Sequence, residues 1–333
     1  MNMKTWANAQ IAQKNKKAMP VLSFPSVQLL GITVKQLISD PDLQARGMKL
    51  IADNFDTAAS VSMMDLSVEA EAFGAKVKFS DDEVPTVTGR LVQSAQDAEN
   101  LKIPKVGTGR TGLYIEAIKK AAKLITDRPV FAGVIGPFSL AGRLLDMTEI
   151  MMLCYEEPET VHKVLEKTTE FITEYILSYK SVGANGVIMA EPAAGLLSPS
   201  LIKEFSSDYI QKIVKKVKSD DFAFIYHNCG NTVPLVKEIL AVDATGYHFG
   251  NAINMKDILP LMPKTVPVFG NIDPAGEFKN GTPASIREKT LALLKECGPK
   301  YNNFIISSGC DIPPMSSTDN IKSFFKAVAE YYK

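Results

Sequence analysis

Two stretches close together in the chain decide its fold: DFAFIYHNCG at residues 221–230 and ATGYHFGN at residues 244–251. Each is a short apolar run that ends in polar residues and glycine. Neither alternates strictly between apolar and polar side chains, which is typical of strands buried on both faces of a parallel sheet. Five further runs share this character: FDTAASVSMMD (55–65), RPVFAGVIGPF (128–138), ANGVIMAEP (184–192), TVPVFGNID (265–273) and NNFIISSGC (302–310).

Amphipathic segments with recognisable helix starts separate these runs. Asp40-Pro41, Ser198-Pro199 and Thr282-Pro283 each read as an N-cap residue followed by proline in the first turn. Repeated strand–helix units predict an α/β protein with a parallel sheet. About seven or eight units in one chain favour a closed (β/α)8 TIM barrel. We expect a single domain over residues 1–333, with an N-terminal extension (1–50) and a small β-rich insertion (77–91).

Composition excludes several functional classes. Lys+Arg and Asp+Glu both number 37, so the net charge is zero and gives no bulk attraction for nucleic acid or an anionic membrane. The four cysteines are sparse in a long chain, which argues against a disulfide framework. The N-terminus lacks a signal-peptide apolar core, and the longest apolar stretch (129–142) is short and broken. We therefore expect a cytoplasmic protein without a membrane span; its oligomeric state stays open.

Polar residues follow the predicted strands at their carboxyl ends, where active sites of barrels lie. The residues in these positions are Asp65, Glu69, Glu191, His227, Cys229, His248, Asn271, Asp273, Cys310 and Asp311. Their shared position predicts one common site.

His227, Cys229 and Cys310 form the most specific pattern among them, in a chain with only three His and four Cys. Residues i and i+2 of a strand point to the same face, so His227 and Cys229 can address one ion together. One imidazole and two thiolates suit Zn²⁺ and leave its fourth tetrahedral position open. This favours a catalytic zinc site, although each cysteine alone is compatible with a small buried hydrophobic residue.

Other polar residues keep several interpretations. His248 is compatible with a hydrogen-bond donor to a metal ligand, a packed core histidine or a ligand itself. Glu191 is compatible with a fourth metal ligand, a general base or a structural partner of a buried amide. GTGRTG (107–112) matches G-x-G-x-x-G but lacks the strand and the acidic residue of a dinucleotide site, so we expect a loop leading into a helix at 113–126. Arg110 in that loop, like Arg143, could still bind an anionic substrate.

The sequence resembles the uroporphyrinogen decarboxylase superfamily over nearly its whole length. The stretches that carry the resemblance are GITVKQLISDPDLQARGM, MDLSVEAEAFGA, VIGPFSLAGRLL, ANGVIMAEPAAGLLSPSLIKEF, HNCGNTVPLV, GNIDP and SSGCDIPPMSSTDNI. The His-x-Cys…Cys set resembles the branch of methylcobalamin:coenzyme M methyltransferases and related corrinoid-dependent methyltransferases.

This resemblance implies zinc-dependent transfer of a methyl group from a methylcorrinoid to a thiol such as coenzyme M. Zinc would be held by His227, Cys229 and Cys310, and the zinc-bound thiolate would attack the methyl group on Co(III). The donor would be methylcobalamin or, because no D-x-H-x-x-G corrinoid signature occurs here, a methylcorrinoid on a separate small protein. The candidate catalytic residues are Glu191, His248 and Asp273, all placed after strands. The candidate cofactor-binding residues are Asp65 and Asn271, also after strands, and Arg110 in the 107–112 loop.

Three alternatives stay open. A metal-independent decarboxylase-like lyase is disfavoured because the R-Q-A-G-R-Y type of N-terminal signature is replaced by QKNKKAMPVLSFPSVQLLG. Methyl transfer to tetrahydrofolate or another acceptor is the second alternative. A non-catalytic partner of a corrinoid protein, or a zinc-binding regulator, is the third.

Overall fold

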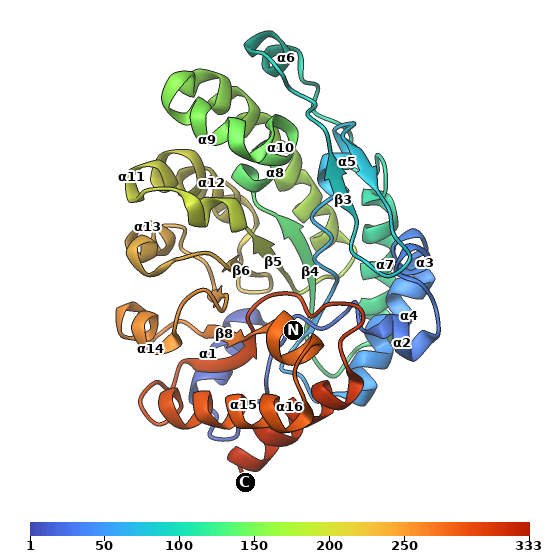
Figure 1. Ribbon diagram of the computed structural model, residues 1–333, viewed down its shortest axis with the longest axis vertical. Helices are drawn as coiled ribbons and strands as arrows, with labels where there is room; N and C mark the ends of the chain where they lie inside the picture. The colour runs from blue at the N-terminus through green and yellow to red at the C-terminus, as the bar shows by residue number, and fades with distance from the viewer.

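A curled, wholly parallel sheet of seven strands forms the centre of the computed structural model, which describes residues 1–333. The strands run in the order β1-β4-β5-β6-β7-β8-β9, so each pairs with the next one along the chain. Figure 1 shows the elements following one another around this sheet in chain order, from blue to red. The strands are β1 (Ser60–Val61), β4 (Val130–Ile135), β5 (Gly186–Ala190), β6 (Ala223–Asn228), β7 (Gly246–Phe249), β8 (Val268–Ile272) and β9 (Phe304–Ser308).

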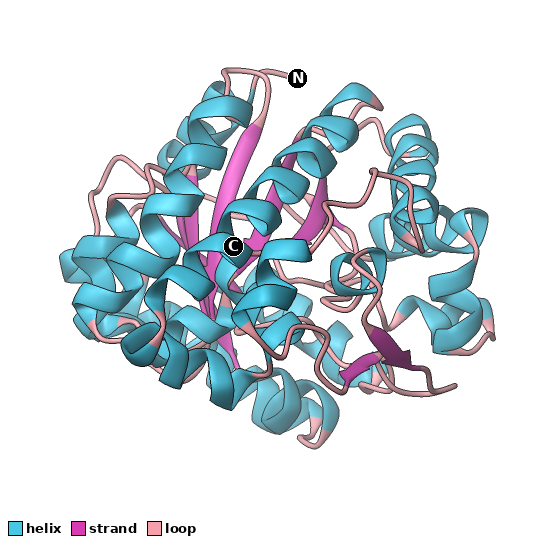
Figure 2. Ribbon diagram, turned by 90° about the horizontal axis from the view of Figure 1, so that it is seen from above, coloured by secondary structure: helices cyan, strands magenta, loops and turns pink.

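Helices surround the sheet, with the strands at the centre of the molecule (Figure 2). The longer ones are α1 (Met3–Ala12), α4 (Pro41–Asn54), α7 (Thr111–Leu124), α8 (Pro137–Leu145), α9 (Met147–Glu156), α10 (Pro158–Ser181), α12 (Asp208–Val217), α15 (Pro283–Cys297) and α16 (Thr318–Tyr331). Shorter helices are α2 (Ser26–Leu30), α3 (Val34–Ser39), α5 (Val68–Ala72), α6 (Ala95–Asn100), α11 (Pro199–Ile202), α13 (Val236–Leu240) and α14 (Met255–Ile258). No helix is both long enough and apolar enough to cross a membrane.

The sequence predictions of local structure are largely confirmed. Each of the seven apolar runs contains one strand of the sheet. The three predicted N-caps are present: the side chains of Asp40, Ser198 and Thr282 accept hydrogen bonds from backbone N–H groups of the first turn, and each precedes a proline. The β-rich insertion is an antiparallel hairpin of β2 (Lys76–Lys78) and β3 (Thr86–Thr88), which stands apart from the sheet (Figure 2).

The predicted eight-stranded barrel is not confirmed, because the sheet contains seven strands. Residues 18–22 bridge the two edge strands instead. Met19 N–H donates to the carbonyl of Ile306 in β9, and Ala58 N–H, just before β1, donates to the carbonyl of Ala18. Pro20 has no N–H group, so it interrupts any regular ladder in this segment. Part of the expected N-terminal extension thus lies between the two edge strands, β9 and β1.

The concave side of the sheet is apolar at its amino end. Phe131, Ile225, Phe269 and Ile305 are fully buried there in one cluster with the side chains of α1. Trp6 of α1 packs edge-on against Phe131, with ring centroids 5.2 Å apart, and its Nε1–H donates to the carbonyl of Ala58 at 3.2 Å. The amino end is therefore closed by an apolar plug.

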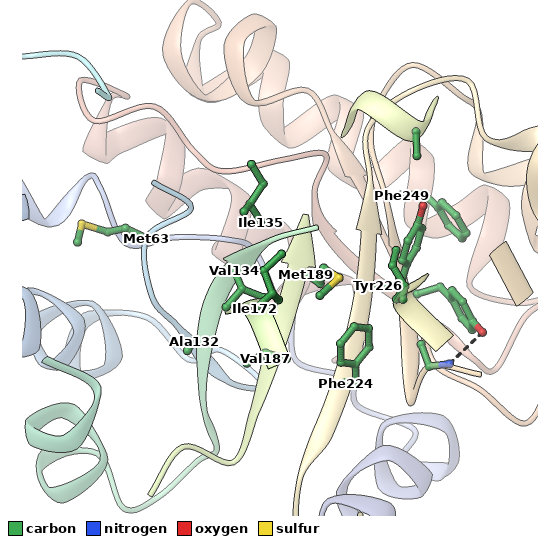
Figure 3. Close-up of a cluster of buried hydrophobic side chains, with 14 of the residues drawn as sticks. Met63, Ala132, Val134, Ile135, Ile172, Val187, Met189, Phe224, Tyr226 and Phe249 are labelled. Carbon is green, nitrogen blue, oxygen red and sulfur yellow. Dashed lines mark hydrogen bonds between the residues drawn. The ribbon is translucent and has the colours of Figure 1, made fainter. Parts of the chain in front are cut away.

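The convex side packs against the helices. Val134 of β4, Val187 and Met189 of β5, and Phe224 of β6 belong to the main core cluster, together with Ile172 of α10 (Figure 3). Because both faces of these strands are buried, polar side chains within them occur only near their carboxyl ends. This concentrates the chemistry of the chain at one end of the sheet.

Candidate metal centre

The ends of β6 and β9 bring together the three predicted metal ligands. His227 is the penultimate residue of β6, Cys229 directly follows that strand, and Cys310 lies two residues beyond β9. One ligand atom from each residue lies within 4.8 Å of the others. The predicted group of His227, Cys229 and Cys310 is therefore present as a spatial cluster.

The two thiols of this cluster share a hydrogen bond. A hydrogen bond from Cys310 lowers the pKa of Cys229, against the effect of burial. The same contact, together with burial, raises the pKa of Cys310. The contact thus favours the thiolate form at Cys229 and the thiol form at Cys310.

A chain of hydrogen bonds fixes the orientation and the tautomer of His227. The Ser307 hydroxyl donates to the carbonyl of Met19 at 2.7 Å, so its oxygen accepts from His248 Nε2–H, also at 2.7 Å. Burial and the neighbouring His227 lower the pKa of His248, which is therefore neutral and accepts at Nδ1. His227 Nδ1–H donates to that Nδ1 atom at 2.7 Å and lies 3.2 Å from the His248 carbonyl.

This arrangement leaves His227 Nε2 without a proton. That atom is buried and has no hydrogen-bond partner in the protein. A lone pair held in place by a hydrogen bond on the opposite ring nitrogen is the usual state of a metal-binding histidine. His248 is a hydrogen-bonding partner of His227, but it accepts at Nδ1, where the sequence led us to expect a donor.

The donor set fits a zinc ion. Ligand atoms bound at about 2.0–2.3 Å to tetrahedral Zn²⁺ lie about 3.5–3.8 Å apart. The three atoms here lie within 4.8 Å of one another, so a contraction of about 1 Å is enough to bind the ion. Three protein ligands leave one corner for a substrate, as in catalytic rather than structural zinc sites.

Gly250, just after β7, allows the loop of Cys229 to approach the loop of Cys310. A Cβ atom at Gly250 would lie 2.5 Å from the Cys229 Cβ and 3.0 Å from the Gly309 carbonyl. No side chain fits between these backbones, so the glycine sets the position of Cys229.

Glu191 points away from the cluster. Its Oε1 atom accepts from Phe138 N–H and from the Ser206 hydroxyl, and its Oε2 atom accepts from Ser139 N–H, all at 2.9 Å. Phe138 and Ser139 belong to the first turn of α8, where a carboxylate is stabilised by the orphan N–H groups. These contacts match the structural interpretation of Glu191, and no oxygen of this carboxyl group joins the three metal ligands.

Asp65 and Arg110 meet in a buried ionic network. Arg110 forms ion pairs with Asp65 through Nη1 and with Glu71 through Nε, the latter at 2.6 Å, and Nη2–H donates to Ser67 at 2.8 Å. The Tyr114 hydroxyl donates to Asp65 at 2.7 Å. Internal partners thus occupy every nitrogen of the guanidinium group.

Asn271 and Asp273 hold loops in place. Asn271 Nδ2 donates to the carbonyls of Gly250 and Ile253, at 2.9 and 2.8 Å. Asp273 accepts from Ala275 and Gly276 N–H, each at 2.9 Å, and so caps the π-helical turn Pro274–Lys279. Asn271 therefore supports the Gly250 turn beside the metal ligands, and the roles predicted for both residues stay predictions.

The family model of uroporphyrinogen decarboxylase (URO-D) matches residues 16–331 of this chain. The chain belongs to the URO-D family. Among curated URO-D relatives, it is 28% identical over 271 residues to the methylcobamide:CoM methyltransferase MtbA of Methanosarcina acetivorans, covering 80% of this chain and 78% of the relative. A uroporphyrinogen decarboxylase of Hydrogenovibrio crunogenus is 25% identical over 297 residues, covering 84% and 80%.

Solved structures share the URO-D fold of the chain. A methyltransferase from Methanosarcina mazei superposes with a TM-score of 0.85 at 23% identity and full coverage of both chains. A B12-independent methionine synthase from Shewanella superposes with a TM-score of 0.64 at 13% identity, over 95% of each chain. At these sequence identities, the structural similarity shows a shared fold only.

Two features of the site, Ser307 and Gly250, were not predicted from the sequence, whereas Glu69 was among the polar residues expected after the strands. Ser307 lies on the same strand face as Ile305, three residues before Cys310, and its contact with His248 was not foreseen. Gly250 follows the polar end of β7, and the glycine after GYHF in the sequence could have indicated a close backbone approach there. Glu69 is buried at the end of β4, where its Oε1 atom accepts from Ile135 N–H at 3.0 Å. Burial raises the pKa of Glu69 to about 7.

Proposed function

We propose that this protein is a zinc-dependent methyltransferase that moves a methyl group from a methylcorrinoid to a thiol. The observation that carries the proposal is the cluster of His227 Nε2, Cys229 and Cys310, which offers three ligands of zinc type and one open corner.

The comparisons support the same activity at a coarser level. The relatives from Methanosarcina acetivorans and Methanosarcina mazei are both methylcobamide:CoM methyltransferases, and the M. mazei structure is a methyltransferase. The prediction of a methyltransferase is confirmed at that level. Coenzyme M is therefore one candidate acceptor, alongside other thiols and tetrahydrofolate.

His227, Cys229 and Cys310 would hold the zinc ion. Zinc, when bound, lowers the pKa of a coordinating thiol, so that an acceptor thiol reacts as the more nucleophilic thiolate. Both sulfurs must be deprotonated to act as thiolate ligands, and the raised pKa of Cys310 makes metal binding release a proton there. His248, kept neutral by burial, accepts the Nδ1–H of His227 and holds Nε2 toward the ion.

The apolar plug at the amino end of the sheet leaves the carboxyl end as the side from which substrates approach. The methyl donor would be methylcobalamin or, as the chain lacks a corrinoid-binding signature, a methylcorrinoid on a small partner protein. The acceptor thiol would bind zinc at the position that His227, Cys229 and Cys310 leave free.

A metal-independent decarboxylase is the second candidate, because curated decarboxylases match the chain at 24–25% identity. It gives no role to the cysteine pair or to the orphan Nε2 atom of His227. Release of CO₂ from uroporphyrinogen by the purified protein would favour this candidate over methyl transfer.

Metal analysis of single variants tests the proposed site. The wild-type protein should bind about one zinc ion per chain. Cys310→Ser and Cys229→Ser should each lose the ion, because a hydroxyl group is a poor substitute for a thiolate. Cys297→Ser is the matched control, since Cys297 is buried at the end of α15 and lies outside the cluster. Equal zinc content in all four proteins would contradict the assignment of the ligands.

A further inference from the structure

A surface cavity of about 660 Å³ lies at the end of the sheet opposite the proposed zinc site. Its walls are the end of α1 with the chain that follows (11–16), the turn after α15 (298–302) and the end of α16 (331–332). The turn after α15 leads into β9, which places the cavity at the amino end of the sheet. Figure 1 shows α15 and α16 side by side near the C-terminus. The cavity shares no residue with the proposed metal site.

This cavity carries positive charge. Lys14 and Lys16 line it, and no aspartate or glutamate does. By contrast, the cavity between α10 and α12 and the cavity beside α9 are each lined by three glutamates. The chain as a whole has zero net charge, so the excess of lysine is local. A concave surface lined by one sign of charge favours a ligand of the opposite sign, here an anion.

Backbone contacts hold Lys16 in place within the cavity. Its Nζ atom donates to the carbonyl of Gln10 and, at 3.2 Å, to the carbonyl of Ile11, both in the last turn of α1. An ammonium group has three N–H donors, so one is left for a ligand. Both partners are neutral carbonyls, and burial lowers the pKa of Lys16 to about 8. A bound anion would supply the counter-charge that this half-buried ammonium group lacks.

Two tyrosines form an aromatic wall of the cavity. The rings of Tyr331 and Tyr332 meet edge to face, with centroids 4.9 Å apart and planes at 87°. Gly298 makes room for this arrangement, because a Cβ atom there would lie 2.7 Å from the Tyr331 hydroxyl oxygen. Both side chains are half-buried, which leaves part of each ring open to a ligand. Exposed tyrosine rings bind other aromatic rings, and their hydroxyl groups donate hydrogen bonds.

We propose that this cavity binds a nucleotide, whose phosphoryl groups contact Lys14 and Lys16 and whose base packs against Tyr331 and Tyr332. The chemical class is a phosphorylated ligand with an aromatic ring. The cavity volume lies within the range of about 300–1,000 Å³ that is usual for small-molecule sites. Lysine is a common phosphate ligand, and an aromatic side chain accepts the face or the edge of any base. This site is additional to the proposed methyl transfer and independent of it.

Three probes separate the two halves of the proposed ligand. Adenosine diphosphate (ADP) has both the base and the phosphates, adenosine lacks the phosphates, and pyrophosphate lacks the base. Binding of each to the purified full-length protein is measured by isothermal titration calorimetry, without a methyl donor. We expect one ADP per chain, bound at least about tenfold more tightly than adenosine or pyrophosphate, because only ADP makes both sets of contacts.

Variants place the bound ADP in this cavity. Lys16→Gln should weaken ADP binding about tenfold, as for one charge-assisted hydrogen bond, and Lys14→Gln, at an exposed position where folding is unaffected, should weaken it in the same direction. Tyr332→Leu should weaken the binding of ADP and leave that of pyrophosphate unchanged. Lys17→Gln is the matched control: it removes the same charge one residue further along the chain, but Lys17 pairs with Asp56 at 2.7 Å and does not line the cavity.

Each contrary result overturns the nucleotide site. Absence of ADP binding at millimolar concentration would do so directly. Equal ADP affinity in the wild type, Lys16→Gln and Lys14→Gln would locate ADP elsewhere on the protein. Pyrophosphate binding as tight as that of ADP would replace the nucleotide site by a site for phosphate alone. None of these results bears on thiol methylation, since the measurements contain no methyl donor and the variants lie outside the metal site.

Discussion

His248 accepts the Nδ1–H of His227 at 2.7 Å, and this contact determines which nitrogen of His227 can bind a metal. Because His248 is neutral and donates its own Nε2–H to Ser307, it can only accept at Nδ1. His227 Nε2 is consequently free, buried and directed by its ring geometry away from His248. The metal affinity of the cluster should therefore depend on residues that do not touch the metal.

Ser307→Ala should weaken zinc binding. Removing the hydroxyl takes away the acceptor of His248 Nε2–H. The tautomer of His248 is then no longer fixed. Outer partners of metal ligands typically contribute roughly 10–100-fold in affinity, and we expect a loss in that range in a chelator competition assay. Ser308→Ala is a close control: Ser308 is also buried, but its hydroxyl accepts from Val21 N–H at 3.0 Å. Equal affinities of the two variants would refute the proposed role of Ser307.

Gly250→Ala should displace Cys229. The new Cβ atom would overlap the Cys229 Cβ at 2.5 Å, a separation that real structures do not tolerate, so one of the two loops must shift. Since zinc ligands are held within a few tenths of an ångström, we expect at least about tenfold weaker zinc binding. Gly31→Ala, at the end of α2 with open space around it, tests whether any glycine replacement has this effect. Zinc affinity in that control should stay at the wild-type value.

Glu191→Ala should destabilise the fold and spare the metal. The variant leaves two N–H groups of α8 and the Ser206 hydroxyl without their acceptor in a fully buried place. Such losses cost about 3 kcal/mol of unfolding free energy, measurable by urea denaturation. Glu166→Ala, on an exposed position of α10, should change the midpoint little. Loss of zinc from a Glu191→Ala protein of normal stability would instead reveal Glu191 as a metal ligand.

Glu69 should make the protein less stable as pH rises. Burial raises its pKa from 4.5 to about 7, so the folded state holds this proton more tightly than the unfolded state. Its contribution is complete below pH 4.5 and is lost as pH rises to about 7, amounting to about 3 kcal/mol. Glu69→Gln cannot titrate, so the difference in unfolding free energy between wild type and variant should shift by that amount across this range. A difference independent of pH would show that Glu69 titrates normally.

The strands and the metal ligands could be predicted from sequence because both depend on short-range patterns. Apolar runs of strand length marked all seven strands, and the i, i+2 spacing of His227 and Cys229 placed both on one face. Cys310 joined them because the carboxyl ends of parallel strands meet at one end of the sheet. The eighth strand was expected only because strand–helix units repeat along the chain. In the segment that bridges the edge strands, the missing N–H group of Pro20 is the one sign in the sequence that no regular strand forms there.

Side-chain direction and long-range pairing could not be read from the sequence. Glu191 directly follows β5, and one residue decides whether its carboxyl group faces the concave side or the helices. The ion pair of Arg110 with Asp65 joins residues far apart in the chain, so a cation free to bind substrate could not be told from a neutralised one. That the chain forms one domain, and that it is cytoplasmic, both stay predictions.

Methyl transfer from methylcobalamin to a thiol, followed by the loss of the methylcobalamin absorbance, tests the central claim most directly. Zinc-loaded protein should transfer the methyl group, protein stripped of metal by a chelator should not, and added zinc should restore the activity. The Cys310→Ser protein should stay inactive after zinc is added. Full transfer by the metal-free protein, or by Cys310→Ser, would contradict the account.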